Sequence, residues 1–351
     1  MICVNIPDTI AWDPEKECIR YIDQTQLPGH LTMVECRTVQ RLETAITRLE
    51  VRGAPALGVA GAFGVALAAV TCKKRGLAPF LAAVRRQGNL LAATRPTAIN
   101  LSWGVNRVLT AMEQRAASVS EAKQIALAEA QDVAHEDEAC CQAIGTYGAA
   151  LLPERCTVLT HCNAGALACK AWGTALGVIR SAVRQGKDLK VIACETRPLL
   201  QGARLTAWEL TQEGIDVTVI TDSTGAHLMR GGIIDLVIVG ADRITPDAVF
   251  NKIGTYMHAV CARHHGIPFY VAAPLSTFDA DHVENDVIIE ERPRDEIARC
   301  GTCITVPEGV KILNPAFDAT PMDLVTAIIT EQGVLRPPLD MKALSRYRTT
   351  R

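Results

Sequence analysis

A thiol stands in a short polar turn that follows an apolar segment. Residues 157–160 (TVLT) are β-branched and aliphatic, which predicts a buried strand, and residues 161–165 (HCNAG) break that pattern. Helical spacing resumes from residue 166, so we expect a helix to begin directly after the turn. Its free N–H groups and dipole would hold an anion and stabilise the thiolate of Cys162. With 13 cysteines in the chain, a purely structural role for a buried Cys162 is the alternative.

A carboxyl group occupies the matching position after a second apolar segment. Asp242 follows residues 237–240 (VIVG), which predict another buried strand. In an open α/β sheet, ligands bind beyond the carboxyl ends of the strands. A partly desolvated carboxyl group there would keep its proton and could act as a general acid. The alternatives are an ion pair between Asp242 and Arg243, or a helix cap.

Two arginines have the setting of anion-binding residues. Arg52, Gly53 and Ala54 precede Pro55, which suits the first turn of a helix, so this turn could hold a phosphate through backbone N–H groups and a guanidinium. A plain connector with a solvated Arg52 is the alternative. Arg95 lies in a turn at residues 94–97 (TRPT), from which it could face a ligand.

Metal and nucleotide sites have little support in the sequence. Cys300 and Cys303 form a C-x-x-C pair, but no second pair and no nearby histidine cluster would complete a zinc site. No glycine-rich dinucleotide motif follows a strand, and no phosphate-binding P-loop is present. We therefore expect no metal and no cofactor.

The elements that would position these residues change in kind near residue 150. After a hairpin at residues 9–23, helices are predicted at 38–49, 54–70, 79–93, 101–116 and 120–151. Strands are then predicted at 156–160, 190–194, 216–220, 236–240, 269–273 and 302–304. Helices are predicted between and after them at 166–185, 201–213, 223–230, 252–264 and 323–331.

This alternation indicates an α/β protein of two domains. Residues 1–150 would form a small β hairpin with helices, and residues 151–351 a Rossmann-like parallel sheet covered by helices on both faces. The loops after the strands, including those with Cys162 and Asp242, should converge on one edge of that sheet.

Composition excludes several classes of function. A net charge of −2 offers no basic surface for nucleic acid or for an acidic membrane, which favours a small-molecule substrate. The irregularly spaced cysteines indicate free thiols in a reducing cytoplasm, and no signal peptide is visible. The apolar run at residues 54–70 is rich in alanine and glycine, so we expect a buried helix rather than a membrane span.

Seven blocks of sequence, taken in order, resemble the methylthioribose-1-phosphate isomerase family. That family belongs to a superfamily shared with regulatory subunits of translation initiation factor 2B. The match runs from about residue 9 to residue 337, in what looks like an archaeal-type variant. The blocks are RGAPALG (52–58), RPTAINL (95–101), LTHCNAGAL (159–167), ETRP with QGARLTAWEL (195–198 and 201–210), VGADRI (239–244), NKIGTY (251–256) and NPAFD (314–318).

The resemblance implies conversion of an aldose 1-phosphate into a ketose 1-phosphate in methionine salvage, by a homodimer without metal or nucleotide cofactor. It places the catalytic residues at Cys162 and Asp242. It places the substrate-binding residues at Arg52, Gly53, Ala54, Arg95, Gln201, Asn251 and Lys252.

One segment departs from the family pattern. Residues 245–250 (TPDAVF) replace a longer segment with Asn-Gly-Asp that bacterial members commonly carry. Because this segment borders the implied site, it leaves the substituent at the sugar's 5-position open. An isomerase for 5-deoxyribose 1-phosphate or ribose 1,5-bisphosphate is one alternative. A non-catalytic regulatory protein of the translation-factor branch is the other.

Overall fold

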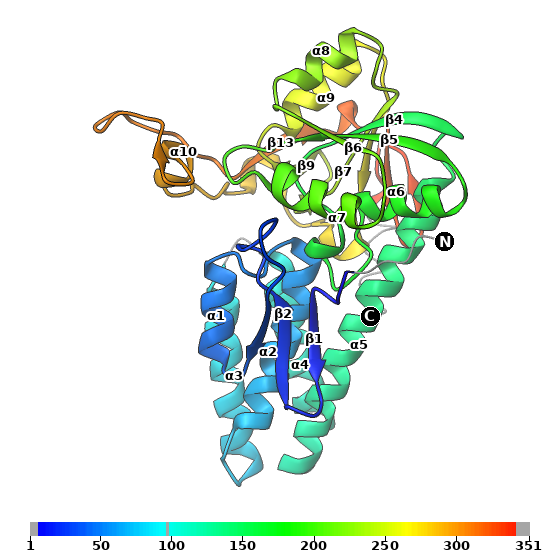
Figure 1. The fold of residues 1–351 in the computed structure, drawn as a ribbon. Coiled ribbons are helices and arrows are strands. Elements are labelled where there is room, and N and C mark those ends of the chain that lie inside the picture. Colours follow the sequence, from blue (N-terminus) through cyan, green and yellow to red (C-terminus); the bar gives the residue numbers. More distant parts are fainter. Residues whose placement is uncertain (1–5, 96–97, 342–351) are drawn as a thin grey trace. The chain divides into compact units, whose positions relative to one another are not determined.

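The chain divides into two compact units in a computed structural model that describes residues 6–95 and 98–341 (Figure 1). Among these residues, the N-terminal unit holds those up to 142 together with residues 165–177. The C-terminal unit holds residues 143–164 and those from 178 onward. The chain therefore leaves each unit and returns to it.

The N-terminal unit begins with a three-stranded antiparallel sheet in the order β1-β2-β3. Its strands are β1 Ile10–Asp13, β2 Cys18–Ile22 and β3 Met33–Cys36. The hairpin predicted at residues 9–23 is confirmed, and Asp13 fixes its turn by accepting the N–H groups of Glu15 and Lys16. Strand β3 was not predicted, because its four residues carry no clear alternation.

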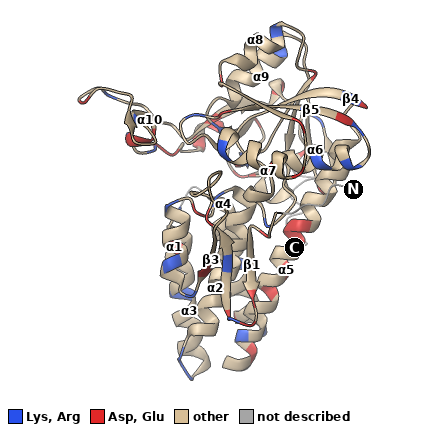
Figure 2. Cartoon of the chain, in the orientation of Figure 1, with Lys and Arg blue, Asp and Glu red and all other residues tan. Residues whose placement is uncertain are grey.

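Five helices follow this sheet along the chain, close to the predicted ranges. They are α1 Val39–Thr47, α2 Ala54–Thr71, α3 Leu77–Ala93, α4 Ile99–Arg115 and α5 Val119–Ala149. The α2 helix carries no charged residue and is drawn without one in Figure 2. It is long and apolar enough to cross a membrane, but 78% of it is buried within the structure. The prediction of a buried core helix is therefore confirmed.

A seven-stranded sheet forms the C-terminal unit, in the order β15-β14-β10-β7-β4-β5-β6. Its strands are β4 Arg155–Thr160, β5 Asp188–Cys194, β6 Val217–Ile220, β7 Leu236–Val239, β10 Phe269–Ala272, β14 Ala327–Thr330 and β15 Gly333–Leu335. Six strands are parallel and β15 is antiparallel at the edge. The prediction of a Rossmann-like parallel sheet is confirmed.

The remaining helices of this part of the chain are α6 Ala175–Arg184, α7 Ala207–Gln212, α8 Thr224–Arg230, α9 Thr255–His264 and α10 Asp295–Ala298. A π-helical turn at Gly202–Thr206 leads into α7. A second, three-stranded antiparallel sheet contains β8 Arg243–Ile244, β9 Ala248–Lys252 and β13 Phe317–Pro321.

Two predictions of secondary structure were wrong, and one predicted strand lies outside the large sheet. The helix expected from residue 166 begins only at Ala175, and residues 323–331, expected to be helical, contain strand β14. The strand expected at residues 302–304 is β12 Cys303–Ile304, which pairs only with β11 Arg299–Cys300, outside the large sheet. The apolar run AIIT of β14 is fully buried, and a short buried apolar run is compatible with a helix as well as with a strand.

Candidate active site

The strand order of the large sheet reverses between β4 and β7. Strands β5 and β6 lie on one side of β4, while β7, β10 and β14 lie on the other. Sheets of this order bind ligands in the crevice at the reversal, outside the carboxyl ends of the strands. Cys162 follows β4 and Asp242 follows β7, and these strands pair directly through Val158–Leu236 and Leu159–Val237. The fold thus brings the predicted thiol and carboxyl group to neighbouring strand ends.

The backbone of Cys162 is held from both sides by threonine hydroxyl groups. Its N–H donates to Oγ1 of Thr196 at 2.8 Å, and its carbonyl accepts from Oγ1 of Thr206 at 2.7 Å. Cys162 has a φ of 65°, in the left-handed region that non-glycine residues seldom adopt. These two bonds hold it in that conformation, with the side chain half-buried.

A carboxylate after the next strand supports Thr196 in turn. Asp222, which follows β6, accepts the N–H of Thr196 at 2.7 Å and the N–H of Arg197 at 2.8 Å. Thr196 also has a left-handed φ of 66°. The loops after three neighbouring strands, β4, β5 and β6, are therefore joined through Cys162, Thr196 and Asp222. The sequence predicts polar residues in these loops, but it does not indicate which of them hold the backbone of Cys162.

The residue after Cys162 belongs to a buried charge network. The Asn163 amide donates to Oε1 of Glu209 at 2.9 Å, and the other carboxylate oxygen of Glu209 accepts from Arg180 at 2.6 Å. Arg180 also donates to Glu213 at 2.7 Å, and all three charged side chains are at most 1% exposed. This network fixes the position of α6 relative to α7.

The helix start expected beside Cys162 is absent from this turn, so the helix N-terminus that was expected to hold an anion there is not formed. Residues 166–168 form a single 3₁₀ turn, and left-handed φ values at Trp172 and Gly173 prevent a continuous helix. The segment instead packs within the N-terminal unit. Gln24 donates to the carbonyl of Leu167 at 2.7 Å, and Asp137 accepts the N–H of Lys170 at 2.7 Å. These tertiary contacts override the helical spacing of the sequence.

Asp242 opens a hairpin made by the segment that departs from the family pattern. Its N–H donates to the carbonyl of Phe250 at 2.8 Å, and β8 pairs with β9 across a turn in which Thr245 contacts Asp247. Arg243, the ion-pair partner considered from the sequence, lies 3.3 Å from Asp279. Asp242 itself is half-buried.

Three further implied residues lie in the same unit. Asn251 donates to Oγ1 of Thr255 at 3.0 Å, and Lys252 donates to the carbonyl of Ala316 at 2.9 Å. Gln201 precedes the π-helical turn and is buried, and its Oε1 has no hydrogen-bond partner among the residues that the structure describes.

The other implied residues lie in the N-terminal unit. Gly53 and Ala54 form the start of α2, with Pro55 in its first turn as predicted. Arg52 is buried, and its Nε donates to Gln24 at 2.9 Å. Arg95 directly follows α3 and its cap, while Pro96 and Thr97 of the same motif lie outside the described residues.

Only glycine fits at position 53. Its φ is 98°, and a Cβ atom there would lie 2.5 Å from the backbone of Ala168. The turn predicted from Arg-Gly-Ala-Pro is therefore set by close contact between two backbone segments of the N-terminal unit.

A cluster that the sequence did not predict lies directly before Cys162. His161, Cys194 and His258 are buried, and one ligand atom from each lies within 4.8 Å of the others. Burial lowers the pKa of His161 to about 4 and that of His258 to about 3, and it raises the pKa of the Cys194 thiol. No local spacing motif could have indicated this cluster, because its members come from three separate elements.

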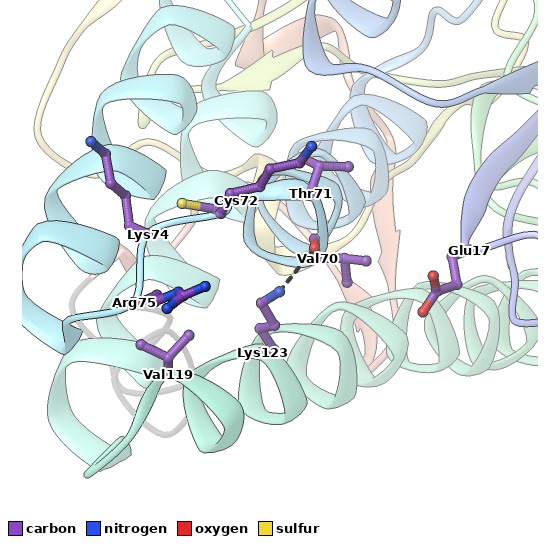
Figure 3. A pocket seen from close by; sticks show the side chains of 9 residues that line it. Glu17, Val70, Thr71, Cys72, Lys74, Arg75, Val119 and Lys123 are labelled. Atoms are coloured by element: carbon purple, nitrogen blue, oxygen red, sulfur yellow. Dashed lines mark hydrogen bonds between the residues drawn. The ribbon is translucent and has the colours of Figure 1, made fainter.

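A basic pocket lies in the N-terminal unit, apart from the implied residues. Figure 3 shows it at the C-terminal end of α2, with Lys74, Arg75 and Lys123 among its lining residues. Its volume is about 670 Å³, and none of Arg52, Gly53, Ala54 or Arg95 lines it.

Comparison with known proteins assigns the chain to a family. Residues 50–337 match the model of the initiation factor 2 subunit family. The chain belongs to this family.

Two relatives within the family are named as isomerases. The methylthioribose-1-phosphate isomerase of Heliobacterium modesticaldum is 53% identical over 94% of this chain and 96% of its own length. The 5-deoxyribose 1-phosphate isomerase of Moorella thermoacetica is 53% identical over 91% of this chain and 92% of its own length.

Two solved structures share the fold. The crystal structure of 5-methylthioribose 1-phosphate isomerase from Pyrococcus horikoshii OT3 has a TM-score of 0.91 at 41% identity, over 98% of this chain and 97% of that one. The crystal structure of translation initiation factor eIF-2B, subunit delta, from A. fulgidus has a TM-score of 0.87 at 53% identity, over 97% of this chain and 100% of that one.

Proposed function

We propose that this protein isomerises 5-methylthio-D-ribose 1-phosphate to 5-methylthio-D-ribulose 1-phosphate in methionine salvage. The observation that carries the proposal is the placement of Cys162 and Asp242 after the paired strands β4 and β7, where the strand order reverses. Relatives named as isomerases, 53% identical over nearly their whole length, support the same reaction class.

The reaction requires both an acid and a base. The anomeric oxygen of the substrate carries the phosphate, so the sugar has no free aldehyde and its ring must open first. Asp242 donates a proton to the ring oxygen as the C1–O bond breaks. The thiolate of Cys162 removes the proton from C2, which gives an enol phosphate, and returns it to C1. The C2 hydroxyl group gives its proton back to Asp242 as it becomes the ketone, so both residues end in their starting states. A hydride shift from C2 to C1 is the competing route.

The other implied residues would bind and orient the sugar phosphate. We assign the phosphate and hydroxyl groups to Arg52, the N–H groups of Gly53 and Ala54, Arg95, Asn251 and Lys252. Gln201 is a further contact, because its buried amide oxygen has no partner in the described part of the chain and is suited to accept a hydrogen bond from a ligand. We propose that the protein acts in the cytoplasm as a homodimer and that the reaction needs no metal or nucleotide cofactor.

A second substrate, which differs in the substituent at the 5-position of the sugar, also has support. The relative from Moorella thermoacetica is named for 5-deoxyribose 1-phosphate at the same level of identity as the methylthioribose enzyme. Ribose 1,5-bisphosphate differs in charge at that position and would need a basic residue there. A regulatory role of the translation-factor type has support from the structure described as subunit delta.

The deciding experiment follows each of the three sugar phosphates by ¹H and ³¹P NMR with the full-length protein. We expect kcat/KM for methylthioribose 1-phosphate to exceed the other two values at least tenfold, a difference of about 1.4 kcal/mol in transition-state binding. Preference for another sugar would move the protein to a different pathway. No turnover of any of them would contradict the isomerase proposal and favour the regulatory role.

A further inference from the structure

Three side chains with metal-ligating atoms lie together in the interior of the C-terminal unit. His161 lies between β4 and Cys162, Cys194 is the last residue of β5, and His258 lies in α9. They are 1%, 0% and 0% exposed, and one ligand atom of each lies within 4.8 Å of the others. A buried imidazole pair beside a thiol is a ligand set that zinc prefers.

The tautomer of His161 leaves a lone pair inside this cluster. Its Nε2 lies 2.8 Å from the carbonyl oxygen of Ile253, so Nε2 must carry the proton that is donated. Nδ1 is then an acceptor, and it is buried without a hydrogen-bond partner among the described residues. Metal-bound histidines almost always donate their other ring N–H in this way, commonly to a backbone carbonyl.

The spacing of the other two ligands fits a tetrahedral ion. Sγ of Cys194 lies 3.4 Å from Nε2 of His258. Sulfur and nitrogen atoms bound to one tetrahedral zinc at about 2.3 and 2.0 Å are separated by about 3.5 Å.

We propose that His161, Cys194 and His258 bind a thiophilic divalent cation of the zinc type. Binding releases the Cys194 proton to solvent and leaves a thiolate on the metal. Three protein ligands leave the fourth position of the ion to water or another small ligand, and the ion joins the ends of β4 and β5 to α9. It also fixes the residue directly before Cys162. The inference does not depend on the proposed function, because it is tested by metal content.

Cobalt is the probe, because Co²⁺ reports thiolate ligation by a charge-transfer band and tetrahedral geometry by intense d–d bands. The background should carry Cys300→Ser and Cys303→Ser, since both thiols are exposed and would bind metal adventitiously. Full-length protein is produced with Co²⁺ in the medium, because the buried site is expected to load during folding. We expect one cobalt per chain, with both spectral signatures.

Two variants of the ligands and one of a neighbouring thiol complete the test. Cys194→Ala should abolish the charge-transfer band, and His258→Leu should lower cobalt affinity at least tenfold. Cys156→Ala is the matched control, because Cys156 is a buried thiol on β4 outside the cluster. That variant should retain the band.

Outcomes with the wild-type ligand set decide the inference even if a variant fails to fold. Zn²⁺ added to chelator-treated protein during refolding should raise Tm, as expected for a ligand that binds the folded state alone. Cobalt content far below one equivalent per chain, or no rise in Tm with Zn²⁺, would overturn the inference. A charge-transfer band that persists in Cys194→Ala would also overturn it.

Discussion

The hydroxyl group of Thr196 accepts the N–H of Cys162, so it fixes the backbone from which the thiol projects. Thr196→Val keeps the β-branched shape but leaves that N–H unpaired, which costs about 1–3 kcal/mol. We expect kcat to fall roughly tenfold because a displaced base loses its alignment with the substrate. Steady-state kinetics measure the effect. Thr196→Ser retains the hydroxyl and should recover most of kcat, whereas equal loss in both variants would contradict a positioning role.

The thiol of Cys162 is expected to act in the chemical step. Cys162→Ser should lower kcat by about 10²–10⁴-fold, because a serine hydroxyl is a far poorer base near neutral pH. KM should change little if the sugar phosphate is held by other residues. Cys156→Ser provides the control, since burial raises the pKa of that β4 thiol to about 11. Turnover of Cys162→Ser at the wild-type rate would exclude Cys162 as the base.

At the scale of elements, the start of α2 depends on a glycine in close contact with a distant backbone segment. Gly53→Ala combines an unfavourable left-handed φ with a Cβ atom 2.5 Å from the backbone of Ala168. The conformation costs about 1–2 kcal/mol and overpacking a further 1–3 kcal/mol. The melting temperature and kcat/KM should both decrease.

Gly186→Ala separates these two causes. Gly186 has a similar φ of 93°, but nothing lies within 4 Å of a Cβ atom placed there. Its substitution should cost only the conformational part, about 1–2 kcal/mol. If the two variants lost equal stability, contact with Ala168 would not be the reason for glycine at position 53.

The buried ion pairs between α6 and α7 should contribute more to the free energy of unfolding than an exposed ion pair does. Arg180→Met leaves the buried carboxylates of Glu209 and Glu213 without their cation, which should cost about 3–5 kcal/mol. Arg85→Met removes one partner of the exposed ion pair with Glu113 and should cost less than about 1 kcal/mol. Urea denaturation of both variants tests the difference, and similar losses would show that burial does not decide the effect.

Elements with a strong hydrophobic periodicity could be predicted from the sequence, whereas the segments that they contact could not. The run at 54–70 and the aliphatic strands β4, β5, β7 and β10 have local patterns that hold in the structure. Residues 166–174 have helical spacing too, but their conformation is set by contacts with Gln24 and Asp137, which are far away in the chain. The same limit applies to the site. Cys162 and Asp242 follow recognisable strands, while Thr196, Asp222 and the histidine cluster matter only through tertiary contact.

At the scale of the whole molecule, buried histidines should make the folded state sensitive to acid. The pKa of His161 is lowered to about 4 and that of His258 to about 3, whereas unfolded histidine titrates near pH 6.5. The unfolded chain therefore binds protons first as pH falls. Stability from these two groups is complete above about pH 6.5 and is lost progressively toward pH 4.

Denaturant unfolding between pH 7 and pH 4 measures this loss, in metal-free protein with a chelator present. His258→Leu should reduce the slope by up to about 1.4 kcal/mol per pH unit. Met257→Leu, at an exposed position of α9 without a titratable group, should leave the slope close to that of the wild type. An unchanged slope in His258→Leu would show that the pKa of His258 is not lowered in the folded state.

The division of the chain into two units limits how the protein can be cut into fragments. The N-terminal unit needs residues 165–177, which supply the carbonyl of Leu167 to Gln24 and the N–H of Lys170 to Asp137. A gene fragment that ends near residue 150 would encode a unit with a missing piece, and a fragment that begins there would carry that piece without its partners. The two halves are therefore not interchangeable modules.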